Sequence, residues 1–237
     1  PIACVGLAFA LALVAVRPAA GVSERERFVL PSVREMRSIL GNSQRSAFTA
    51  LVLVEAAALG ALTAIFRAYG RDVLGVTLAH QGLLLIPAAV VGAAVVVPGG
   101  VIADRLGAKR VMVPGFAVTG ICLLMLARWS DPAFVAATAA VAGVGFGLAV
   151  PAIASTMMAL AGSTSSRGGV IGWFMTMDGI GHAAGPAAAG VLLATLGAEA
   201  VLIAAGGLFL AAASIVLSSR LGEREAAIVP VDVLPPA

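Results

Sequence analysis

The stretch that decides the fold reads GVIADRLGAKR and occupies residues 100–110, between two long apolar runs. Each run approaches or exceeds the length of about 20 residues that crosses a bilayer as a helix. Two such runs joined by a short charged stretch predict a helical hairpin with a polar turn at the membrane surface. The glycine and charged positions of this turn are Gly100, Asp104, Arg105, Gly107, Lys109 and Arg110.

The composition of the whole chain is that of a membrane protein. Hydrophobic residues make up 60% of the 237 residues, charged residues make up 11%, and the mean hydropathy is +1.05. This is too little polar material to cover a soluble globule of the same length. We therefore predict an all-α integral membrane protein whose six complete spans fall at 47–66, 77–99, 111–127, 133–160, 168–196 and 198–219.

The remaining segments predict a domain organisation around a six-helix transmembrane domain, 47–219. Residues 1–16 are apolar but too few for a full span, so we expect the end of a truncated transmembrane helix there. Residues 17–46 predict a basic linker, whose second half is either a short amphipathic helix or a solvated connection. Residues 220–237 follow the last span, and we expect a C-terminal tail there.

The basic residues predict the orientation in the membrane. With six spans, every lysine and arginine except Arg67, Arg71 and Arg128 falls on one side. The positive-inside rule places that side, with the linker and the tail, in the cytoplasm. We expect a multi-pass protein of the plasma or inner membrane. This orientation explains the net charge of +3, so we do not expect a nucleic-acid partner.

In identity and spacing, the six positions of the charged turn resemble the signature cytoplasmic loop of the major facilitator superfamily of membrane transporters. The position between Gly107 and Lys109, often basic in that family, is Ala108 here. We also expect Gly100 to permit close helix approach and Asp104 to cap the start of a helix. The alternative is a charged loop that only sets topology.

The resemblance implies half of a twelve-helix fold, built from two inverted three-helix repeats. The long basic linker ahead of the six spans favours the C-terminal half, although an N-terminal half fits the turn equally well. The implied partners are the N-terminal half of the same transporter, membrane lipid, a small-molecule substrate and protons. The turn would then act as a cytoplasmic gating loop that latches the two halves.

A second pattern lies in the fifth span and resembles the antiporter motif of drug/proton exchangers. Ala189 stands where that motif usually has a glycine. Glycines on one helix face permit close packing in lipid, and a proline can bend the helix. A role in helix packing alone is therefore the alternative to a role in substrate/proton exchange. The motif positions are Gly172, Gly181, Gly185, Pro186 and Gly190.

Three ionisable residues inside the spans are the candidates for proton coupling or substrate binding. Glu55 lies midway along the first span among apolar neighbours, which favour the protonated form of a carboxyl. Asp178 and His182 stand four residues apart in the fifth span, on one helix face. For each of them, a structural contact between helices is the alternative.

The function predicted from these patterns is secondary active transport by alternating access, with proton-coupled efflux favoured. The alternatives are an uptake symporter, a uniporter, or a non-transporting membrane scaffold or sensor. An enzyme is not expected, because Ser155 and Thr156 have no histidine near them in the sequence. With only His80 and His182 as histidines, neither a metal site nor a cofactor is expected.

Overall fold

The computed structural model describes residues 37, 39–162 and 167–221, which belong to one compact unit, 31–237. The expected truncated helix, most of the linker and nearly all of the tail lie outside these residues. Within the described part every regular element is a helix, and six helices are long and apolar enough to cross a membrane. The prediction of an all-α membrane bundle is confirmed.

The elements are α3 (Ser43–Ala68), continued by the π-helix η1 (Tyr69–Val73), then α4 (Leu78–Leu106), α5 (Ala108–Leu126), α6 (Pro132–Ala161), α7 (Arg167–Leu196) and α8 (Ala198–Ser218).

Local sequence sets the helix ends. The side chain of Asn42 accepts hydrogen bonds from the backbone of Gln44 and Arg45 at the start of α3. Thr77 caps α4 in the same way, and Asp131, followed by a proline, caps α6. The chain reverses at glycines with positive φ, where other residues would be strained: Gly107 at 89°, Gly162 at 65° and Gly197 at 85°.

The charged stretch 100–110 is more helical than a turn. Residues 100–106 form the last turns of α4, Gly107 alone reverses the chain, and α5 begins at Ala108. The prediction that Asp104 caps a helix start is therefore wrong, because Asp104 lies in the last turn of α4 and α5 has no side-chain cap. The charges had suggested a loop, but a helix continues past the apolar core of a membrane when its end reaches polar surroundings.

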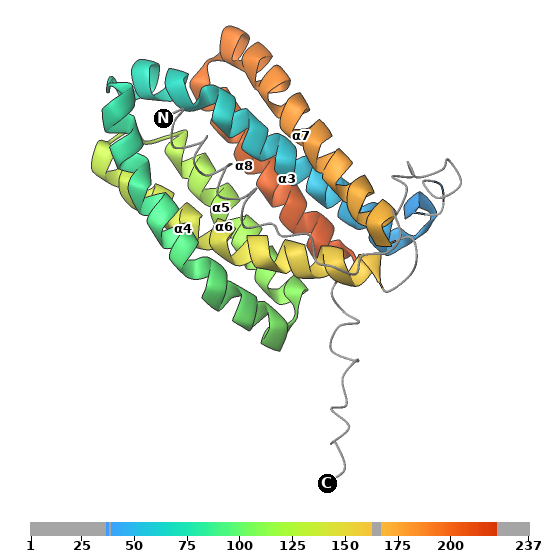
Figure 1. The fold of residues 1–237 in the computed structure, drawn as a ribbon. Helices are drawn as coiled ribbons and strands as arrows, with labels where there is room; N and C mark the ends of the chain where they lie inside the picture. The colour runs from blue at the N-terminus through green and yellow to red at the C-terminus, as the bar shows by residue number, and fades with distance from the viewer. Residues whose placement is uncertain (1–36, 38, 163–166, 222–237) are drawn as a thin grey trace, which may run out of the picture. The chain divides into compact units, whose positions relative to one another are not determined.

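The helices pack in a pattern with approximate two-fold symmetry (Figure 1). Helix α3 packs against α7 and α8, helix α6 packs against α4 and α5, and α5 packs against α8. Exchanging α3 with α6, α4 with α7 and α5 with α8 turns this set of contacts into itself. Two inverted three-helix repeats, α3–α5 and α6–α8, produce this arrangement, as predicted from the sequence.

Small residues stand where the helices come closest. A Cβ atom added to Gly145 in α6 would lie 2.6 Å from the carbonyl oxygen of Gly115 in α5. At the α5–α8 crossing, a Cβ added to Gly120 would lie 2.8 Å from the Gly206 carbonyl oxygen, and the reverse distance is 2.9 Å. The backbones therefore touch at these crossings, as expected for helices that associate in lipid.

The glycines of the fifth-span motif divide between two faces of α7. A Cβ added to Gly181 would lie 2.6 Å from the Leu53 carbonyl oxygen, and one added to Gly185 would meet the backbone of Ala57 and Ala61. A Cβ on Gly172 or Gly190 would meet nothing within 4 Å. Only the middle of the motif holds α7 against α3.

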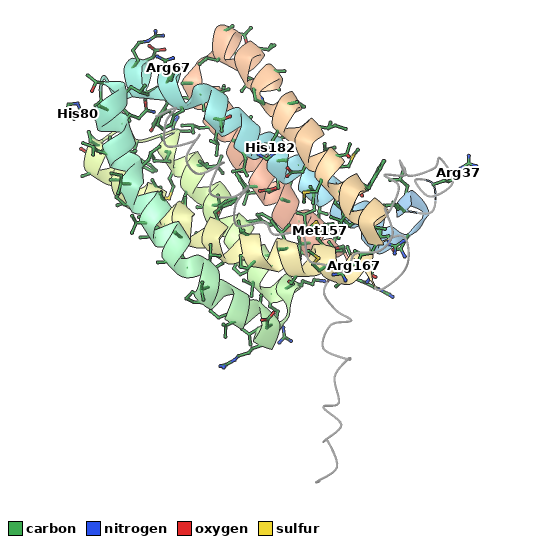
Figure 2. The ribbon with its side chains drawn as sticks, in the orientation of Figure 1. Arg37, Arg67, His80, Met157, Arg167 and His182 are labelled. Atoms are coloured by element: carbon green, nitrogen blue, oxygen red, sulfur yellow. The ribbon has the colours of Figure 1, made fainter. Side chains whose placement is uncertain are left out.

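The basic residues gather at one end of the bundle, which we call the basic end (Figure 2). It comprises the start of α3, the junction of α4 with α5, the end of α6, the start of α7 and the end of α8. Figure 2 shows Arg37 and Arg167 at this end and Arg67 and His80 at the other, which we call the opposite end. This is the grouping predicted from the charge pattern.

Replacing Gly185 by alanine will destabilise the bundle, because the new methyl group has no room against the backbone of α3. Overpacking of this kind costs about 1–3 kcal/mol. The matched control is Gly190→Ala in the same helix, which adds the same methyl group in open space and improves helix propensity by about 1 kcal/mol. Thermal unfolding in detergent should show a lower Tm for Gly185→Ala only, and equal Tm values would contradict the packing described above.

Candidate functional site

The three ionisable residues singled out from the sequence lie close enough for their charges to interact where α3 runs beside α7. Figure 2 shows His182 near the middle of α7, the helix that makes an extensive interface with α3. Glu55 lies at the middle of α3 on the other side of this interface. The structure thus brings together side chains that are more than 120 positions apart in the chain.

The close glycine contact positions these residues. Gly181, between Asp178 and His182 in α7, packs on the backbone of α3 at Leu53. Glu55 lies in the same turn of α3, so the three side chains come to one level of the bundle. On the other side of the same crossing, a Cβ added to Gly60 would lie 2.8 Å from the His182 carbonyl oxygen.

Glu55 is the buried member of the group. Its residue is 6% exposed, and the charges of Asp178 and His182 both act on its carboxyl group. An ionisable residue at membrane depth costs about 2.5–3.5 kcal/mol on insertion scales. A buried carboxyl within reach of the charges of another acid and an imidazole is suited to hold a proton or to balance a cation.

Asp178 and His182 are the accessible members. The Nδ1 atom of His182 lies 3.5 Å from a carboxylate oxygen of Asp178 and 3.2 Å from the backbone oxygen of the same residue. Their side chains are 38% and 44% exposed. The site therefore runs from a buried carboxyl on α3 to a half-exposed acid and imidazole on α7.

Two aromatic contacts that the sequence analysis missed fix α3 against α7 on the basic-end side of this site. The Trp173 indole nitrogen donates a hydrogen bond of 3.1 Å to the Thr49 hydroxyl oxygen, which itself donates to the Arg45 carbonyl at 2.8 Å. Phe48 meets Phe174 edge to face, with ring centroids 4.7 Å apart. The available signal was Trp173 itself, whose N–H needs an acceptor when it lies inside a membrane bundle.

Side chains at the basic end donate hydrogen bonds to carbonyl groups at or just beyond the ends of two helices. Lys109 Nζ donates to the Ser219 carbonyl oxygen at 2.6 Å, and Gln44 donates to that of Arg220 at 2.9 Å, both at the end of α8. Arg45 donates to the Leu160 carbonyl oxygen at 3.3 Å, at the end of α6. Cations at helix C-termini interact favourably with the helix dipole.

The residues of the predicted gating loop thus fall into two groups. Lys109 is engaged within the bundle, whereas Asp104, Arg105 and Arg110 are exposed. Gly100 leaves room for a methyl group at 3.6 Å from Pro151, and the tight position is its neighbour Gly99, where a Cβ would lie 3.2 Å from Gly147. The exposed charges are the ones that remain available for contacts outside the bundle.

The described residues hold no cluster of three histidine, cysteine or acidic side chains that would bind a metal ion. Two carboxyl groups and one imidazole, the ionisable groups of this site, are able to exchange protons and attract cations.

Replacing Lys109 by methionine should loosen the end of α8. The Ser219 carbonyl loses its charged partner, at a cost on the order of 1 kcal/mol, and amide exchange at Ser218 and Ser219 should rise about fivefold. Arg110→Met, which removes the same charge from an exposed neighbour, is the matched control and should leave this exchange unchanged. An equal rise in both variants would contradict a specific role for Lys109.

Comparison with protein-family models matches residues 47–231 of the chain to the Major Facilitator Superfamily. The matched region contains the six membrane helices apart from the first residues of α3. No match was found among the curated proteins. Superfamily members join two six-helix halves, each made of two inverted three-helix repeats, and the bundle described above has the architecture of one such half. The chain is a multi-pass membrane protein that belongs to the Major Facilitator Superfamily.

Proposed function

We propose that this chain is the C-terminal half of a secondary active transporter that exports a small molecule by alternating access, in exchange for protons. The observation that carries the proposal is the buried Glu55 carboxyl, placed by the close α3–α7 contact beside Asp178 and His182. A transporter that couples to protons needs a group that changes protonation at membrane depth, and these residues supply one.

The accessible pair supports a stepwise route for the proton. Asp178 and His182 are half-exposed on α7, so they exchange protons with water or substrate reached from that face. Glu55 lies behind them and holds its proton away from water. Loading Glu55 removes a negative charge from the interface, and unloading restores it, so the charge that a cationic substrate meets depends on the proton.

The exposed charges of the α4–α5 junction support a role at the contact between the two halves. Asp104, Arg105 and Arg110 project at the basic end without being buried in this bundle. We infer that they face the N-terminal half on the cytoplasmic side and favour one access state. The basic end is then the cytoplasmic end, and the C-terminal tail lies in the cytoplasm.

Transport by the complete transporter in proteoliposomes tests the coupling. An inward proton gradient should drive movement of cationic dyes by the unmodified protein. Glu55→Gln should reduce this movement to the level of liposomes without protein, because glutamine keeps the shape but does not bind and release a proton. Asp178→Asn should have the same effect for the same reason.

Glu199→Gln serves as the control, because Glu199 is an exposed acid in the first turn of α8 at the opposite end. Its transport should equal that of the unmodified protein. Gradient-driven dye movement that is unchanged in both Glu55→Gln and Asp178→Asn would overturn proton coupling in this half. Movement without a gradient would favour a uniporter, and movement in the direction of the proton flux would favour a symporter.

The orientation is tested by single cysteines in a background with Cys4 and Cys122 replaced by serine. Ser130→Cys, at the opposite end, should react with a membrane-impermeant maleimide on intact cells. Ser43→Cys, at the start of α3, should react only after the membrane is permeabilised, since we place that end in the cytoplasm. The reverse pattern would invert the proposed topology.

A further inference from the structure

The contact between α3 and α7 contains a layer of side chains between the ionisable site and the basic end. Both helices begin at the basic end and run side by side (Figure 1). The residues of this layer, which we call the aromatic layer, touch one another across the contact and precede the ionisable residues in both helices. They are Phe48 and Thr49 of α3 and Trp173 and Phe174 of α7.

The spacing along each helix puts the aromatic layer on the same faces as the ionisable residues. Phe48 precedes Glu55 by seven residues in α3, and Phe174 precedes Asp178 by four residues in α7. Residues at these spacings share one face of a helix. Water that approached Glu55 from the basic end, inside the bundle, would therefore meet the two phenylalanine rings first.

The rings and the residues behind them are apolar and closely packed. Phe48 and Phe174 are both 0% exposed and meet edge to face, with ring centroids 4.7 Å apart. Leu51 and Val52, which continue α3 from the layer toward Glu55, are 0% and 6% exposed. Water does not occupy a close-packed apolar contact of this kind.

The polar groups of the aromatic layer are bonded to protein partners. The Trp173 indole N–H donates to the Thr49 hydroxyl oxygen at 3.1 Å, and this hydroxyl donates to the Arg45 carbonyl oxygen at 2.8 Å. A buried water needs about two to four polar partners. Both donors of the layer are already used, so the layer gives a water molecule little to hold on to.

The helices around Glu55 offer no other relay toward the basic end. No ionisable residue stands between Arg45 and Glu55 in α3, which is about 15 Å of helix, or between Arg167 and Asp178 in α7. Helix α6 has no ionisable residue, and α8 has only Glu199, in its first turn at the opposite end. Protons cross a membrane protein along chains of acidic and histidine side chains, and such a chain is missing here.

We propose that the aromatic layer is a water seal inside the bundle, which separates Glu55 from the basic end. The seal leaves the half-exposed Asp178 and His182 as the route by which Glu55 exchanges its proton. This role rests on the proposed proton exchange at Glu55. Because the layer lies between helices of one bundle, motion of that bundle against the other half does not open it. Without the seal, protons would reach the basic end in every access state, and exchange would lose its coupling.

Hydroxyl-radical footprinting of the complete transporter in lipid nanodiscs tests the seal, because radicals formed from water oxidise the side chains that water reaches. Phe48→Ala removes one ring of the layer and leaves a cavity. Oxidation of Leu51 and Val52, located by mass spectrometry, should then rise several-fold. The matched control is Phe116→Ala, the same truncation of a 0% exposed phenylalanine in α5, which packs against α6 and α8. It should leave this oxidation unchanged.

Phe174→Leu is the second variant, in case Phe48→Ala does not fold. It keeps an apolar side chain but takes the ring away from Phe48, so oxidation of Leu51 and Val52 should rise by a smaller factor. Unchanged oxidation in a folded variant of the layer would overturn the seal. An equal rise in Phe116→Ala would overturn it as well, because the effect would then come from general loosening of the bundle.

Proton leak separates the seal from the proposed function. The complete transporter is placed in proteoliposomes that carry a pH gradient, a pH-sensitive dye inside and no substrate. Phe48→Ala should leak protons several-fold faster than the unmodified protein, and addition of Glu55→Gln should return the leak to the unmodified rate. Increased oxidation without a leak that depends on Glu55 would support the seal but contradict proton exchange at Glu55.

Discussion

Close approach of helix backbones is the constraint on which the rest of this structure depends. Lipid tails are as apolar as the side chains that face them, so moving an apolar side chain from lipid into a helix contact gains little free energy from the hydrophobic effect. Helices in a membrane therefore associate through packing contacts and hydrogen bonds between them. The α5–α6, α5–α8 and α3–α7 crossings each place a glycine of one helix against the backbone of the next. Because a methyl group does not fit at these points, the positions of the helices follow from where the glycines stand in the sequence.

The same contacts create the chemistry of the bundle. Two helices with larger residues at their crossing would hold Glu55 and Asp178 farther apart, and water or lipid would separate their charges. Gly181 removes that separation, so the charges on α7 act directly on the carboxyl of α3. The aromatic contacts of Phe48 and Trp173 hold the two helices together nearer the basic end. The ionisable site is therefore a consequence of packing as much as of the acidic residues themselves.

The sequence predicted the helices well and the contacts between them only in part. The length of an apolar run and the distribution of charges can be determined from one segment at a time. The sequence therefore predicted the six spans, their order and the grouping of the basic residues. It did not predict the end of α4, because Asp104 and Arg105 suggested a loop, whereas a helix tolerates charges where it leaves the membrane. Helix periodicity places Gly185 and Gly190 about 140° apart on α7, but it does not show which of the two faces α3, as Gly185 does. The hydrogen bond between Trp173 and Thr49 depends on which helices are neighbours, and the sequence does not show this.

The two repeats are interlocked, and this limits how the bundle can move. Helix α3 of the first repeat lies against α7 and α8 of the second, while α6 of the second lies against α4 and α5 of the first. Neither repeat can separate from the other without breaking the glycine contacts that hold them. The bundle should therefore move as one body or bend within a helix, and it should not separate into its two repeats. The ionisable site lies at a contact between the repeats, so a change of charge there acts on the interface that keeps this body rigid.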